Sequence, residues 1–281
     1  MDKKQKIFLR KKANFIRDEI LRVAIPNDAG HIASSLSCVD ILTALYYYCS
    51  CRNLGNTLLD GRDRLVFSKA HGCYGLYAVL ADLGIIPKKE WDNFNEGNRL
   101  GKNKLWGCIE RNLNYCLEAG CGSLGHGLPI AVGIAFGNQL QKKSCYTFCI
   151  VGDGELQEGT TWEALQFGVK HKVKNLIVII DNNRLGAMDF LTNIMDRNEK
   201  DLIKRFQGFG LSPIICSGND VVKLANCIQS AKILSKNMLQ VIVAKTIKGF
   251  GLKCMENVPK FHYRVPNEKD LKMGKTYESE S

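Results

Sequence analysis

Proline is scarce in this sequence: the 281 residues include only 6. This scarcity excludes collagen-like and proline-rich repetitive proteins. Disorder as the main state is excluded as well, because 45% hydrophobic and 24% charged residues leave ample apolar side chains to bury. The length allows one large α/β domain or two small ones.

Acidic residues are fewer than basic ones, 28 against 39, so the net charge is +11. Such an excess is typical of proteins that bind nucleic acid, anionic ligands or acidic partners. However, the lysines and arginines are scattered, and their densest cluster, at residues 3–12, accompanies no nucleic-acid-binding motif. We therefore expect a solvated or partner-facing segment there, and no nucleic acid as partner.

The sequence also lacks paired Cys-x-x-Cys motifs, although it contains 12 cysteines. Its charged start is not typical of a secretory signal peptide, so we expect a cytoplasmic protein whose reduced cysteines serve mostly as small core residues. Residues 119–141 carry no charged side chain, but they include six glycines, a proline and a histidine. That composition argues against a membrane span and predicts a glycine-rich turn that leads into a buried helix.

Apolar runs alternate with helical patterns in the second half of the chain. Runs that are apolar on both faces are typical of parallel strands covered by helices. We therefore predict an α/β fold, a doubly wound, mostly parallel sheet with helices on both faces. One domain is expected over residues 1–250 and an irregular tail over 251–281. The predicted strands are 145–151, 176–180, 214–216 and 240–244; the predicted helices are 11–25, 39–48, 157–170 and 221–234, with a loop turning into a helix over 68–83 and a long loop over 88–118.

Polar residues follow two of the predicted strands. Gly152-Asp153-Gly154 follows the first, and Asp181-Asn182-Asn183 follows the second. Ligands of open α/β sheets bind outside the carboxyl ends of the strands. The carboxylate of Asp153 and the amide oxygen of Asn183 suit Mg²⁺ or Ca²⁺ bridging to a phosphate, and a helix beginning near Gly154 adds backbone amides for an anion. These residues alone predict a metal–phosphate site; the alternative is two ordinary turns.

The spacing of these two segments resembles the thiamine diphosphate motif. Residues 152–159, Gly-Asp-Gly-Glu-Leu-Gln-Glu-Gly, resemble the transketolase family in particular. Four further segments, 29–37, 63–72, 122–128 and 246–262, resemble transketolase motifs in the same order, so the resemblance covers nearly the whole chain. It implies the thiamine-diphosphate-binding fold of the diphosphate-binding (PP) type, with thiamine diphosphate and Mg²⁺ as cofactors.

The resemblance also implies residue roles. Asp153, Asn183 and the backbone carbonyl of Leu185 would hold Mg²⁺, and residues of the C-terminal tail would complete the cofactor site. His31 and His71 would act in proton transfer, and Glu158 would join a carboxylate network across a subunit interface. The residues expected to bind the cofactor are His71, Gly122, Leu124, Gly152, Gly154, Glu155, Asn183 and His262.

The resemblance covers only the diphosphate-binding half of a transketolase. It therefore implies a separate subunit that carries the pyrimidine-binding half, in an α₂β₂ assembly with active sites between chains. The implied reaction transfers a two-carbon ketol unit from a ketose phosphate to an aldehyde, with small sugar phosphates as substrates and no membrane partner.

One position departs from the family pattern. Cys108 stands where a transketolase has a histidine that contacts the donor hydroxyls, and a mostly neutral thiol is a poor hydrogen-bond donor. Either the loop is shifted and Glu110 or Arg111 takes this role, or the donor differs. A 2-oxoacid such as pyruvate, decarboxylated before carboligation, is therefore one alternative. A non-catalytic module that binds the cofactor or regulates a partner is another.

Overall fold

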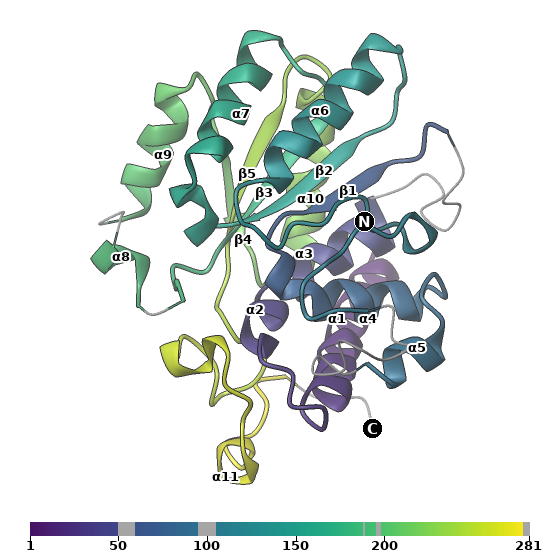
Figure 1. Cartoon of the computed structure of the whole chain (residues 1–281), viewed down its shortest axis with the longest axis vertical. Coiled ribbons are helices and arrows are strands. Elements are labelled where there is room, and N and C mark those ends of the chain that lie inside the picture. Colours follow the sequence, from purple (N-terminus) through teal and green to yellow (C-terminus); the bar gives the residue numbers. More distant parts are fainter. Residues whose placement is uncertain (50–59, 95–104, 188, 195–197, 278–281) are drawn as a thin grey trace.

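The computed structural model describes residues 1–281 except 50–59, 95–104, 188, 195–197 and 278–281. Its centre is a five-stranded sheet in the order β1-β2-β3-β5-β4, and every neighbouring pair is parallel (Figure 1). The predicted parallel α/β sheet is thus confirmed. The strands are β1 (Arg64–Phe67), β2 (Thr147–Gly152), β3 (Leu176–Asn182), β4 (Ile214–Ser217) and β5 (Gln240–Lys245).

Helices cover both faces of this sheet, as a doubly wound fold requires. α6 (Gly127–Leu140) and α7 (Gly159–Lys170) pack together on one face, in front of the strands in Figure 1. α10 (Val221–Leu234) covers the other face and packs against α3 (Val39–Ala44) and α1 (Lys3–Ala24). The remaining helices are α2 (Ile32–Ser37), α4 (Cys73–Asp82), α5 (Lys88–Asp92), α8 (Leu191–Ile194), α9 (Glu199–Gly208) and α11 (Glu268–Leu271).

The sequence pattern located four of the five strands and the longer helices. All four predicted strands are present, and α10 has the predicted bounds. The pattern missed β1, because its four residues begin with an arginine and are too few to show a period. It also missed the short helices α2, α5 and α8, as well as α9. α1 begins at Lys3 rather than at residue 11, because Asp2 and Gln5 form a capping box that starts the helix earlier.

The basic cluster near the N-terminus lies on the exposed face of α1. Lys3, Lys4 and Lys6 are exposed, whereas the core-facing positions further along the helix are buried. Most of the described cysteines are buried, in keeping with their predicted use as small core residues, and Cys51 lies outside the described residues. Among the described helices, none combines the length and the apolar character that crossing a bilayer requires.

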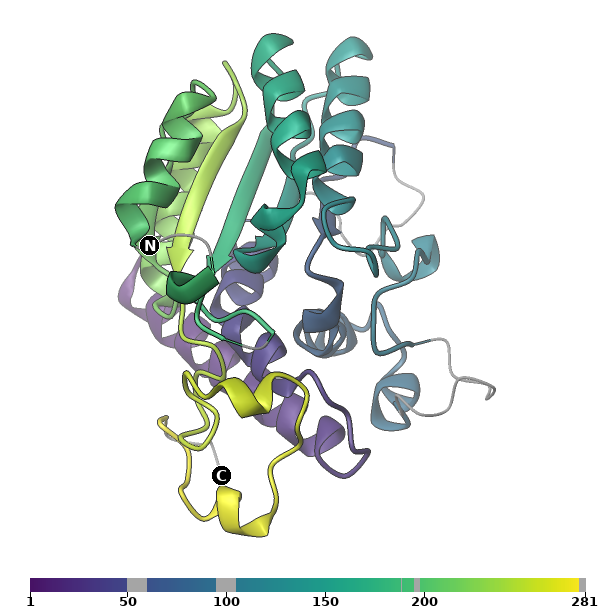
Figure 2. The same cartoon turned by 60° about the vertical axis from the view of Figure 1, so that its left-hand side comes forward.

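The C-terminal segment folds back onto the first helices. Gly249 donates a backbone hydrogen bond to Ala33 of α2 over 2.9 Å, and the Tyr277 hydroxyl donates to Asp18 of α1 over 2.6 Å. The segment therefore lies at the same end of the sheet as α2, as Figure 2 shows. It contains a short 3-10 turn, Pro259–His262, and α11, and is otherwise irregular. The division into a domain and a tail stays a prediction.

Close packing at the start of α6 leads to a first test. A Cβ added to Gly127 would lie 2.3 Å from Ser68 Oγ and 2.7 Å from Ser68 Cα. We expect Gly127→Ala to lower the free energy of unfolding by about 1–3 kcal/mol, because the backbone of Ser68 must move. Gly133→Ala is the matched control: it lies on the same helix with nothing within 4 Å.

The control should be neutral or stabilising by up to about 1 kcal/mol, since alanine favours the helix. Urea unfolding of the two variants and the native chain measures both effects. Equal stability of Gly127→Ala and Gly133→Ala would contradict this account of the packing.

Candidate active site

The carboxyl edge of the sheet brings together residues that are far apart in the sequence. Gly152 at the end of β2 is in register with Asp181 of β3, and Asp181 is in register with Ala244 of β5. The segments that follow these three strands therefore begin side by side. Ser68, directly after β1, joins them through a 2.8 Å hydrogen bond from its amide to Ile150 of β2. The polar residues at this edge form the candidate active site.

A buried ion pair lies at the centre of this edge. Lys69 is 1% exposed, and its ammonium group contacts the carboxylate of Asp181, which is fully buried. The ammonium group also donates to the carbonyl of Ser34 over 2.9 Å. Burial lowers the pKa of Lys69, but the nearby Asp181 carboxylate outweighs it and raises the pKa overall. Lys69 therefore stays charged inside the protein.

Asp181 also accepts hydrogen bonds from two neighbouring hydroxyls. Ser37 Oγ of α2 donates over 2.8 Å, and Thr246 Oγ1, just after β5, contacts the same carboxylate oxygen. Asn183 Nδ2 donates to Ser37 Oγ over 3.1 Å. The predicted ligand Asn183 is thus oriented by the residues around Asp181. The sequence pattern places Lys69 within a motif but assigns no role to it or to Asp181.

The three predicted metal ligands lie on adjacent segments after β2 and β3. Asp153 accepts from the backbone amides of Gly154, over 2.8 Å, and Arg184. Asn183 Oδ1 accepts from the amide of Leu185 over 3.0 Å. Burial, followed by the charge of Asp181, raises the pKa of Asp153 to about 7. A buried carboxylate that lacks a neutralising partner favours a bound cation, and carboxylate, amide and carbonyl oxygens are the donors that Mg²⁺ prefers.

A lysine ammonium group already occupies the carbonyl side of this site. Lys248, only 2% exposed, donates to the carbonyl of Leu185 over 3.0 Å and to that of Gly186 over 3.2 Å. The Leu185 carbonyl thus accepts a hydrogen bond from a cationic group, and its role as a metal ligand stays a prediction. Within the described residues, Lys248 makes no ion pair with a carboxylate. Burial, then the charge of Lys69, lowers its pKa to about 8. The residues present thus fit both a metal ion and an anion bound beside it.

Three of the five histidines converge on the same place. The ring centroids of His31, His71 and His262 lie between 5.2 and 5.8 Å apart. His262 Nδ1 lies 2.7 Å from the ammonium group of Lys248. Burial, then the charge of Lys248, lowers the pKa of His262 to about 4, and burial, then Lys69, holds the pKa of His71 well below its usual value. Both rings are therefore neutral near pH 7, where they can donate hydrogen bonds.

Glu155 makes hydrogen bonds to three surrounding segments of the chain. Its carboxylate accepts from the amide of Gly125 over 2.8 Å, from the amide of Gly152 over 3.2 Å and from the hydroxyl of Ser68. Gly125 has φ +84°, and a Cβ there would lie 2.5 Å from Glu158 Cβ, so only glycine fits this turn. Glu155 therefore positions three loops. Its direct contact with a cofactor stays a prediction.

The remaining predicted residues lie toward the surface. Gly122 and Cys108 line one hollow of about 450 Å³, together with the alternative candidate Glu110, and Cys108 is half-buried there. Leu124 is half-buried and Glu158 is exposed. These positions suit contacts with a substrate or a second chain, but the roles of the individual residues stay predictions.

The central ion pair can be tested by removing its charge from one side. We expect Asp181→Asn to lower the free energy of unfolding by about 3–5 kcal/mol, because Lys69 would be left as an uncompensated buried cation. Glu199→Gln is the matched control, since it removes one carboxylate from the solvent-exposed pair with Lys245. Its effect should lie within about 1 kcal/mol.

Chemical unfolding at pH 7 measures both variants. A second readout is the double variant Asp181→Asn, Lys69→Met, which should recover part of the lost stability. If Asp181→Asn is no less stable than Glu199→Gln, the buried pair does not organise this edge.

Comparison with known proteins agrees with this geometry. The family described as "Transketolase, thiamine diphosphate binding domain" matches residues 10–277. A protein of Actinobacillus succinogenes that is named as one subunit of an apulose-4-phosphate transketolase is 33% identical over 267 residues, which cover 95% of this chain and 94% of that protein. Its namesake from Phocaeicola vulgatus is 31% identical and covers 89% of this chain and 86% of its own length.

Longer transketolases match over part of their length. The human transketolase is 32% identical over 90% of this chain, which spans 39% of that protein. The crystal structure of the Campylobacter jejuni transketolase superposes on this chain with a TM-score of 0.81 and is 27% identical in sequence. The match covers 97% of this chain and 42% of the Campylobacter jejuni chain. Fold, ordered motifs and matched length agree, so the chain belongs to the transketolase family and carries its thiamine diphosphate binding domain.

Proposed function

We propose that this chain is the diphosphate-binding subunit of a two-component transketolase, which transfers a two-carbon ketol unit from a ketose phosphate to an aldehyde. The observation that carries the proposal is the carboxyl edge of the sheet. There Asp153, Asn183 and the Leu185 carbonyl lie beside Lys248 and the histidines, an arrangement that suits a cation and a diphosphate bound together. When bound, thiamine diphosphate supplies the electron sink that carbon–carbon bond cleavage and formation need.

In this proposal, different residues of the chain bind the metal ion and the diphosphate. Asp153, Asn183 and the Leu185 carbonyl hold Mg²⁺. The ammonium group of Lys248 and the neutral rings of His71 and His262 donate hydrogen bonds to the diphosphate oxygens. Burial strengthens these contacts because little water competes for the same donors. Lys69 stays paired with Asp181 and fixes the turn that carries His71.

His31 is placed to move a proton at the substrate. Its Nδ1 lies 3.2 Å from the backbone carbonyl of His262, which can only accept a hydrogen bond. A proton on Nδ1 satisfies this contact, and Nε2 is then the ring atom that can accept a proton. The half-buried position of His31 lets a substrate hydroxyl approach. We propose that Nε2 accepts the proton of that hydroxyl as the donor sugar is cleaved.

The proposal includes a second polypeptide. Two relatives that this chain matches over most of their length are named as subunits rather than as whole enzymes, and the chain spans about two fifths of the longer transketolases. The missing half would carry the pyrimidine-binding domain and cover the exposed Glu158 and Gly122. An α₂β₂ assembly would place each active site between unlike chains.

The names of two relatives indicate which donor to test first. Both of these relatives are named for apulose 4-phosphate, so this sugar phosphate is the first donor to test, together with xylulose 5-phosphate. The half-buried Cys108 in the hollow beside Gly122 keeps a 2-oxoacid donor as the second candidate. Release of CO₂ from pyruvate would identify that alternative.

Metal dependence tests the site directly. We expect Asp153→Ala to abolish Mg²⁺-dependent binding of thiamine diphosphate in the assembled enzyme, because the only carboxylate among the three proposed ligands is lost. Chelation of the native enzyme with EDTA should have the same effect, and added Mg²⁺ should restore binding. Glu163→Ala, an exposed position on α7, is the matched control and should bind normally. Calorimetric titration with the cofactor measures all three, and undiminished binding by Asp153→Ala would rule out this metal site.

The second polypeptide is tested by capture of this chain from its source cells in Mg²⁺ and thiamine diphosphate. We expect a co-purifying chain that carries a pyrimidine-binding half, and ketol transfer only when both chains are present. Recovery of this chain alone, and no transfer from either sugar phosphate, would favour the non-catalytic module.

A further inference from the structure

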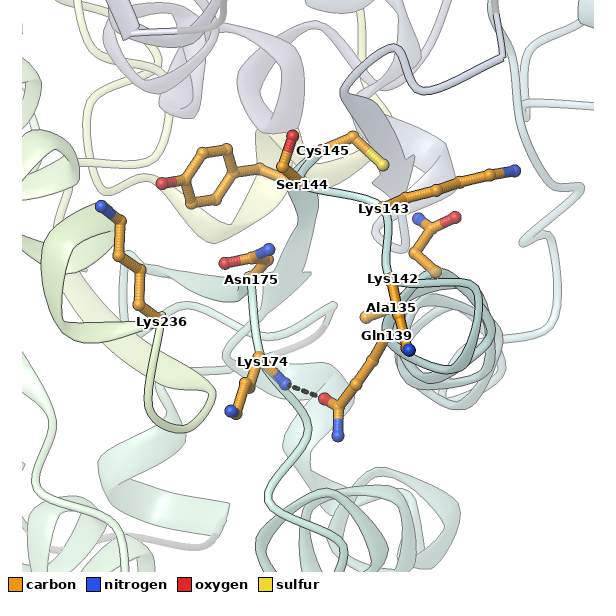
Figure 3. A pocket seen from close by; sticks show the side chains of 11 residues that line it. Ala135, Gln139, Lys142, Lys143, Ser144, Cys145, Lys174, Asn175 and Lys236 are labelled. Carbon is orange, nitrogen blue, oxygen red and sulfur yellow. Dashed lines mark hydrogen bonds between the residues drawn. The ribbon is translucent and has the colours of Figure 1, made fainter.

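A second charged hollow lies at the opposite edge of the sheet, remote in the fold from the histidines. It is formed by the segments that lead into β2 and β3 and by the loop after α10, and its volume is about 500 Å³ (Figure 3). The amino ends of the strands meet here, whereas the candidate active site lies at their carboxyl ends. The hollow is therefore separate from the metal–diphosphate site.

The lining of this hollow has one sign of charge. It includes Lys142, Lys143, Lys174 and Lys236, and no aspartate or glutamate. Lys143 pairs with Asp60 outside the hollow. Across the part of the chain that the structure describes, the other three lysines make no ion pair with a carboxylate. A concave surface lined by like charges concentrates its field and attracts ions of the opposite sign.

Hydrogen bonds between the surrounding loops hold the shape of the hollow. Gln139 Oε1 of α6 accepts from the backbone amide of Lys174 over 2.7 Å, as the dashed line in Figure 3 shows. The amide of Asn175 donates to the Ser235 carbonyl over 2.8 Å, and the Asn175 carbonyl accepts from Thr147 over 2.8 Å. Three segments from different parts of the chain are thus tied together by the protein's own hydrogen bonds, and each of them contributes lysines to the hollow.

The wall of the hollow also contains an unsatisfied donor. Asn138 Nδ2 is buried and makes no hydrogen bond within the described part of the chain. Buried amide groups normally have a partner, since leaving one unpaired costs free energy. A small side-chain rotation toward the hollow would give this donor an acceptor on a bound molecule, and the donor would then add to the three lysine charges.

We propose that this hollow binds a small phosphate-bearing anion that carries at least two negative charges. Its volume lies within the range of small-molecule sites, about 300–1,000 Å³. Four of its eleven lining residues are lysines, which suits a phosphorylated metabolite better than an apolar ligand. The proposal does not depend on the transketolase activity, because its residues lie at the other end of the sheet.

The same lysines also follow the carboxyl ends of helices, where positive charge stabilises the helix dipole. Lys142 lies just after α6 and Lys236 just after α10. Such a role predicts a loss of stability when they are neutralised, by a few tenths to about 1 kcal/mol each. It predicts no site-specific effect on anion binding. Binding and unfolding, measured on the same variants, therefore separate the two roles.

The test compares two triple variants of the full chain that remove the same charge. Lys142→Gln, Lys174→Gln and Lys236→Gln neutralise the hollow. Lys200→Gln, Lys204→Gln and Lys269→Gln neutralise exposed lysines elsewhere and serve as the control. Each chain is titrated in Mg²⁺-free buffer with pyrophosphate, with ribose 5-phosphate and with uncharged ribose. Amide hydrogen exchange of residues 138–147 and 172–176 reports binding at the hollow and distinguishes it from binding at the histidines.

In the native and control chains we expect pyrophosphate to protect these two segments. The hollow variant should need at least about ten times as much pyrophosphate for the same protection. This shift is the combined effect of losing three solvent-exposed charge contacts. Protection by ribose 5-phosphate as well would identify a sugar phosphate as the ligand. Protection by pyrophosphate alone would identify a diphosphate as the ligand.

Absence of protection in the native chain would overturn the proposal, as would equal protection in the two triple variants. The single variant Lys174→Glu replaces the triple if the latter unfolds. None of these results depends on the second polypeptide or on cofactor binding, so failure here leaves the proposed enzyme function untouched.

Discussion

The buried contact between Lys69 and Asp181 is the interaction on which the candidate site depends. Removing two charges from water costs several kcal/mol per ion unless hydrogen bonds compensate. Here the carboxylate also receives the hydroxyls of Ser37 and Thr246, and the ammonium group also donates to Ser34. These partners come from α2, from the turn after β1 and from the segment after β5, so one anion fixes three loops relative to β3. His71 lies two residues beyond Lys69 and takes its position from the same turn.

The charges that remain outside this pair decide what the site can bind. Lys248 contacts carbonyls and His262 rather than a carboxylate, while the buried Asp153 donates its backbone amide to the carbonyl of Asp181 over 3.3 Å. Burying either charged group alone costs free energy, because burial disfavours the charged form. For the same reason the pKa of Lys248 is lowered and the pKa of Asp153 is raised. A metal ion beside Asp153 and a diphosphate beside Lys248, as proposed, would relieve both costs at once. The site is therefore complementary to an ion pair rather than to either ion.

The sequence predicted the parts of this arrangement that rest on local pattern. β2 and β3 are recognisable because apolar runs end in Gly152-Asp153-Gly154 and Asp181-Asn182-Asn183, and parallel pairing then brings the two ends together. β1 was missed because four residues carry too little pattern. Lys69 and Lys248 received no role because a lysine in a sequence is solvated by default. Only the fold shows that they are 1% and 2% exposed.

Several of the predicted site residues lie at the surface of the described part of the chain, although a catalytic centre must exclude water. Gly122 and Glu158 are exposed, and Leu124 is half-buried. A second chain that packs against these positions would shield them from water. The geometry of the half-site and the matched length of the relatives therefore favour the same two-component enzyme.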